Sequence, residues 1–238
     1  MTSTDETRID HPEGTIVESA SRDLRAPRAA GVAGIAFSIL FTAALLMLRA
    51  SVGPQQSLLA VQQRVERGSV WTDELALYIV AFSGIAFLWF MAVVRDRIGE
   101  REDKFFATVF LGSGLIFVAL MYVTVAVAAG LLVSKRFADA QLPDAQLVSF
   151  ARSFGYVVLM VFGVKMAGVF TISTSSILAR SGSWPRWTWV AGYACALIML
   201  LSVSYSGLSV LVFPAWVAAI SCYVLISGRD ARPETPTS

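Results

Sequence analysis

Six apolar stretches, each long enough to cross a bilayer, occupy most of the 238-residue chain. A helix rises ~1.5 Å per residue, so about 20 apolar residues cross a hydrocarbon core of ~30 Å. Lipid offers no hydrogen bonds to backbone amides, and the stretches lack the period-two alternation of a barrel strand. We therefore predict an all-α bundle of six transmembrane helices within residues 29–228. The predicted spans cover residues 29–48, 74–94, 106–133, 151–178, 187–205 and 208–226.

The ends and loops of the chain predict its orientation. Residues 1–28 and 229–238 are polar and are expected to be disordered tails, and the first span is expected to be a retained anchor. On one side of the predicted bundle the tails and loops hold twelve Lys and Arg residues, and on the other side they hold five. Because cytoplasmic loops carry the excess of basic residues, both termini are predicted to be cytoplasmic, with the protein in the plasma membrane.

The composition excludes several functional classes. The chain is 56% hydrophobic and 15% charged, and its net charge of +2 is too small to predict a nucleic-acid partner. Its single histidine, His11, lies in the polar tail, so the spans lack the ligands of a histidine-bound haem or a proton relay. Cys195 and Cys222 fall inside spans and are expected to be small buried hydrophobes. We expect no metal and no cofactor, and the lack of inward acidic and histidine residues makes a membrane enzyme a less favoured third alternative.

Lys165 is the residue most suggestive of a site, because it lies near the centre of the fourth predicted span. A charged amine there costs at least ~2.5–3.5 kcal/mol, so it should face the bundle or a wet cavity. Gly168, one turn away, would let another helix approach that face. Lys165 is then either a binding point for an anionic headgroup, carboxylate or ion, or a structural residue. The structural alternatives are snorkelling, or bonding to carbonyl and hydroxyl oxygens of a neighbouring helix.

Two further residues of the same span are candidates. Arg152, thirteen residues before Lys165, is about 140° around an ideal helix from it. An ion pair of Arg152 with Asp73 or Glu74 is expected in preference to substrate binding. Ser176 lies nearly on the face of Lys165, within a run of hydroxyls from Thr171 to Ser176. These hydroxyls either line a polar path or, as we favour, bond to carbonyls four residues earlier.

Two sequence segments resemble known proteins. Residues 82–114, FSGIAFLWFMAVVRDRIGEREDKFFATVFLGSG, and residues 212–226, VFPAWVAAISCYVLI, are similar to uncharacterised small polytopic membrane proteins of actinobacteria. That resemblance extends over about residues 27–228 and implies a topology but no activity. The opening of the second span, with Trp71, Glu74, Leu75 and Tyr78, is also similar to the small permease subunit of tripartite periplasmic transporters. That family has four spans and a different segment after the second, so we set it aside.

These patterns predict a multi-pass, non-enzymatic accessory or assembly component that binds other membrane proteins or lipids. The alternative is a small transporter or lipid-binding protein with an anionic-ligand site at Lys165, Ser176 and Arg152. The expected partners are the lipid bilayer and other membrane proteins or an anionic lipid, and nucleic acid is not among them.

Overall fold

The computed structural model describes residues 31–47, 70–98, 104–137, 145–182, 184–202 and 209–227. Throughout these ranges all regular secondary structure is helical, which confirms the predicted fold class for this part of the chain. The helices, in chain order, are Gly31–Met47, α3 (Val70–Ile98), α4 (Lys104–Phe137), α5 (Ala145–Tyr156), η1 (Val157–Gly163), α6 (Val164–Ser181), α7 (Arg186–Leu201) and α8 (Ser209–Ser227). The segment η1 is a π-helix, and it joins α5 to α6 without a break.

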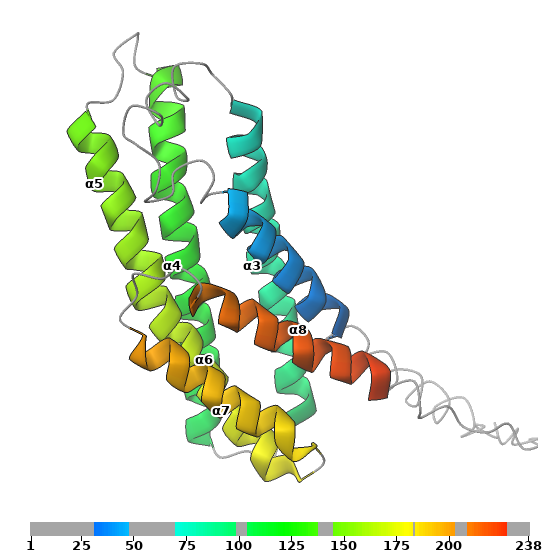
Figure 1. The fold of residues 1–238 in the computed structure, drawn as a ribbon. Coiled ribbons are helices and arrows are strands. Elements are labelled where there is room, and N and C mark those ends of the chain that lie inside the picture. The colour runs from blue at the N-terminus through cyan, green and yellow to red at the C-terminus, as the bar shows by residue number, and fades with distance from the viewer. Residues whose placement is uncertain are drawn as a thin grey trace, which may run out of the picture.

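Three long helical rods and three short helices make up the bundle (Figure 1). Among the described residues, four segments are long and apolar enough to cross a membrane, namely Leu75–Arg95, Phe105–Gly130, Gln146–Ser181 and Val210–Ser227. Gly31–Met47 and Arg186–Leu201 are also apolar, but they are shorter. By length and composition, the described residues thus contain four candidate spans, and the predicted number of six stays a prediction.

A cluster of phenylalanine rings forms the centre of the bundle. Each ring is at most 2% exposed, and the rings come from Gly31–Met47, α3, α4, α6 and α8. Phe87 is central, with its ring centroid 4.7 Å from that of Phe37 and 5.1 Å from that of Phe170. This cluster, called the phenylalanine core below, comprises Phe37, Phe41, Phe87, Phe90, Phe110, Phe117, Phe170 and Phe213.

Glycines bring the helix backbones close together around this core. A Cβ at Gly34 would overlap the side chains of Ser221 and Phe90, so Gly31–Met47 packs closely against both α8 and α3. A Cβ at Gly192 would likewise overlap the hydroxyl of Ser175, where α7 meets α6. Small residues thus permit close helix contact, as in other membrane bundles.

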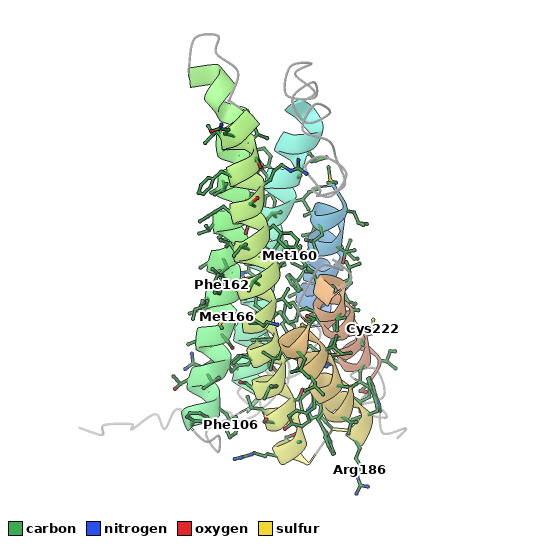
Figure 2. All side chains as sticks on the ribbon, turned by 60° about the vertical axis from the view of Figure 1, so that its left-hand side comes forward. Phe106, Met160, Phe162, Met166, Arg186 and Cys222 are labelled. Atoms are coloured by element: carbon green, nitrogen blue, oxygen red, sulfur yellow. The ribbon has the colours of Figure 1, made fainter. Side chains whose placement is uncertain are left out.

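Helix α7 returns antiparallel along the second half of the α5–η1–α6 rod, as Figures 1 and 2 show from two sides. The rod ends at Gly182, whose φ of 66° is the left-handed conformation that glycine adopts readily after a helix. Near the start of α7, Arg186 lies at the end of the molecule in Figure 2, and Met166 lies about midway along the rod. Helices α6 and α7 thus form one hairpin. The candidate site lies where α7 ends, away from the turn at Gly182.

Candidate functional site

The ammonium of Lys165 is bound by the end of α7. Its Nζ donates to the carbonyl oxygens of Leu200 at 2.6 Å, Ser202 at 2.9 Å and Met199 at 3.1 Å. An ammonium has three N–H donors and no acceptor, so these three bonds use its full donor capacity. This is the structural alternative in which the lysine bonds to backbone carbonyls of a neighbouring helix.

The carbonyls are available because α7 ends there. The last four carbonyls of any helix have no partner within the helix. In α7, the N–H of Ser202 donates to the carbonyl of Ile198 at 2.9 Å, and the hydroxyl of Ser202 donates to that of Met199 at 3.2 Å. Lys165 completes this cap and places a positive charge where the helix dipole is negative. The site is therefore a helix C-terminus capped by a side chain from α6.

The position of Lys165 along its rod matches the length of α7. Lys165 is 165 − 145 = 20 residues from Ala145 and 181 − 165 = 16 residues from Ser181. At ~1.5 Å per α-helical residue the second separation is about 24 Å, and the first is at most about 30 Å because it includes η1. Helix α7 also has 16 residues, so it runs back along α6 and ends level with the lysine. Only a helix this short exposes its last carbonyls midway along the rod.

The hydroxyl run of α6 is bonded to its own helix. Its members donate to the carbonyl four residues earlier at 2.7–3.0 Å; they are Thr171, Ser173, Thr174, Ser175 and Ser176. Such bonds hide a hydroxyl at little cost within a helix. This is the arrangement that we favoured over a polar path.

Ser176 shares the face of Lys165 but not its surroundings. Eleven α-helical residues separate the two, which is about 20° of rotation and about 16 Å of rise. Ser176 Oγ lies 2.8 Å from the hydroxyl of Tyr193, midway along α7, whereas Lys165 bonds to the C-terminal end of α7. The structure therefore places these two predicted site residues at separate positions, about two helical turns apart along α7, in one helix–helix interface.

The third predicted residue, Arg152, is half-buried in α5. The side chains of its expected partners, Asp73 and Glu74, lie outside the described residues, so the ion pair stays a prediction. The 140° angle between Arg152 and Lys165 assumed an unbroken α-helix, and this assumption does not hold because η1 lies between them. A π-helix has i→i+5 bonds and a different rotation per residue.

The cysteines and the α7 end also differ from the sequence-based expectation. Cys195 is half-buried, but Cys222 is exposed, so its predicted burial is wrong.

The carbonyls that bind Lys165 were not identified from the sequence, because residues 187–205 were predicted as one continuous span. The polar run SVSYSG at 202–207 was the available signal, since serines and glycine are frequent where helices end.

Aromatic and cationic side chains gather where α6 ends and α7 begins. The ring of Tyr223 in α8 lies 5.4 Å from that of Trp184 and 5.7 Å from that of Trp187. The guanidinium of Arg180 lies 4.5 Å from the ring centroid of Phe106 at the start of α4. Trp, Tyr and Arg together are typical of a bilayer–water interface.

Tyr193→Phe is expected to lower the free energy of unfolding by less than about 1 kcal/mol. The phenol loses its contact with Ser176, but Ser176 still donates to the carbonyl of Ile172 at 2.9 Å. Thermal unfolding in detergent, followed by circular dichroism, measures the change. A loss of several kcal/mol would contradict the view that this hydroxyl run is satisfied within α6.

Comparison with known proteins places the chain in no family. No family, no curated protein and no solved structure matches it. The similarity to small actinobacterial membrane proteins therefore remains an expectation from the sequence, and the site is interpreted from its geometry.

Proposed function

We propose that the chain is a plasma-membrane protein whose six helices enter the bilayer with both termini cytoplasmic, and that it is a non-enzymatic assembly component. In this role it binds another transmembrane helix through an open face of α4. The main evidence is a pair of glycines on that face, Gly112 and Gly130. No other described residue packs against them.

The charged residues of the α5–η1–α6 rod support a transmembrane position. Arg152 and Arg180 are 28 residues apart, which is at most about 42 Å along the rod, because the π-helix η1 between them rises less per residue than an α-helix. A bilayer with its headgroup regions is ~40–45 Å thick, so the two arginines fit its two interfaces. Their midpoint is residue 166, next to Lys165. In this position α7 ends near the bilayer centre, where unpaired carbonyls are most costly and a bound ammonium is most useful.

The open face of α4 is defined by four small residues: Gly112, Ala119, Ala126 and Gly130. Gly112 and Gly130 are 18 residues apart, which is five full turns, so they lie on one line along the helix. A Cβ added at either glycine meets nothing within 4 Å. Ala119 and Ala126, between them, are exposed.

Other glycines in the bundle lie where two helices of the structure touch. At Gly34, Gly84 and Gly192 an added Cβ would overlap a neighbouring helix's side chain. Close approach of helices is the general reason for small residues in membrane proteins, because packing drives helix association in lipid. The α4 face has this composition without such a neighbour among the described residues, which supports a partner helix from outside.

The bonding of Lys165 favours this role over the anion-binding alternative. Its three N–H donors point to the carbonyls of Met199, Leu200 and Ser202. An anionic headgroup or carboxylate would have to displace at least one of them and give up its bond to the ammonium, and hydrogen bonds to charged groups contribute about 1.5–3 kcal/mol each. The hydrogen-bond donors of Lys165 are thus already bonded to the protein's own backbone.

Gly112→Leu combined with Gly130→Leu is expected to abolish the association while leaving the fold intact, because both positions have open space. The association is measured with Ala126→Cys in a chain whose Cys195 and Cys222 are replaced by Ser. Native membranes are treated with a short bifunctional thiol or thiol–amine crosslinker, and adducts are identified by mass spectrometry. The double variant should reduce adduct yield roughly tenfold, equivalent to about 1.4 kcal/mol.

A matched control uses Ala92, an exposed small residue on α3. Ala92→Leu should leave the adducts at residue 126 unchanged, and a cysteine at residue 92 should give few adducts. The assembly role is contradicted when the double leucine variant crosslinks as well as its parent, or when residues 92 and 126 give the same adducts.

A further inference from the structure

Among the described residues, the ligands of the Lys165 ammonium are all uncharged. The oxygens that accept its bonds are backbone carbonyls of Met199, Leu200 and Ser202. Every Asp and Glu of the chain lies outside the residues whose side chains the structure describes. Carbonyl dipoles and the end of the α7 dipole are therefore the observed source of negative potential at this charge.

This arrangement has the chemistry of a monovalent-cation site. Rings of backbone carbonyls replace the hydration shell of potassium in channels, and half-helix C-termini bind cations in transporters. The donor–acceptor distances here are 2.6–3.1 Å. Divalent ions prefer carboxylates and shorter bonds, of about 2.3–2.6 Å for calcium and 2.0–2.1 Å for magnesium. A large monovalent cation fits both the length and the neutrality of these ligands.

We propose that the C-terminus of α7 is a binding site for a monovalent cation, which the chain fills with its own tethered ammonium. A chain without the amine should then bind a free cation of similar size, such as ammonium or potassium, between α6 and α7. The inference does not depend on the assembly role of α4, because it concerns a different face of the bundle.

The test compares Lys165→Ala with Lys165→Met in detergent. Alanine removes the amine and opens space for an ion, whereas methionine removes the amine and fills the space. Thermal unfolding is measured in ammonium, potassium and choline chloride at one fixed concentration. The parent should unfold at the same temperature in all three salts, and both variants in choline should unfold roughly 10 °C lower. Ammonium or potassium should restore at least half of the loss in Lys165→Ala and little of it in Lys165→Met.

For variants that fold, two kinds of result overturn the inference. One is a Lys165→Ala variant as stable as the parent in choline chloride. The other is a loss of stability in Lys165→Ala that is the same in all three salts, or that is restored equally in Lys165→Met. Lys165→Ser, whose small hydroxyl also leaves space, is tested in parallel in case the alanine variant does not fold. If neither variant can be folded in any of the three salts, free cations cannot replace the amine and the inference fails.

Discussion

Lys165→Met should lower the free energy of unfolding by about 3 kcal/mol. The substitution removes the cation from the carbonyls of Met199, Leu200 and Ser202, which lie at the end of α7. A buried unpaired carbonyl costs about 1–3 kcal/mol in soluble proteins, and the values for hydrogen bonds in membrane proteins are lower. Thermal unfolding in detergent measures the total. Hydrogen exchange should become faster for the peptide covering residues 195–202, because the last turn of α7 loses its cap.

Two variants are controls for this prediction. Lys165→Arg keeps a cation and several donors, so it should lose less stability than Lys165→Met, although its planar group fits three converging carbonyls poorly. Phe162→Met changes an exposed apolar residue of the same rod and should have little effect on either measurement. If Lys165→Met unfolds like the parent with unchanged exchange at residues 195–202, α7 ends without needing the ammonium.

The helical class was predictable because the bilayer leaves few alternatives. A long apolar run in lipid must bond its backbone internally, and a helix achieves this within one segment. The inward position of Lys165 followed from the same cost, since a charge in the middle of an apolar run needs polar contacts. These two predictions rest on local sequence, and the structure agrees with both for the described residues.

The partner of Lys165 was not predictable in the same way. Its three carbonyls lie 34 to 37 residues later in the chain and belong to the backbone, so no side chain identifies them. Hydropathy averaged over a window of about 19 residues smooths over the short polar run SVSYSG at 202–207, so the average does not mark the end of α7. The π-helical segment η1 is equally hidden, because its sequence VVLMVFG has the same apolar composition as the run around it. Helix ends and π-segments depend on tertiary contacts.

Phe87→Ala is expected to have the other large effect, a loss of about 3 kcal/mol in unfolding free energy. The ring of Phe87 lies within 6.2 Å, centroid to centroid, of five other rings of the phenylalanine core. These rings belong to Gly31–Met47, α3, α4, α6 and α8, so one substitution weakens contacts among five helices. Thermal unfolding in detergent should occur roughly 6–12 °C lower than in the parent.

A comparison with Phe82→Ala tests whether the loss in Phe87→Ala comes from lost ring packing or from a hydrophobic transfer effect. Phe82 lies five residues earlier on α3 and is 60% exposed, whereas Phe87 is fully buried. Lipid is as apolar as the protein interior, so Phe82→Ala should cost less than about 1 kcal/mol, and Phe87→Ala should lose mainly dispersion contacts around a new cavity. Equal losses in the two variants would mean that the phenylalanine core does not hold the helices together. A large difference would assign the stability of the bundle to ring packing within it.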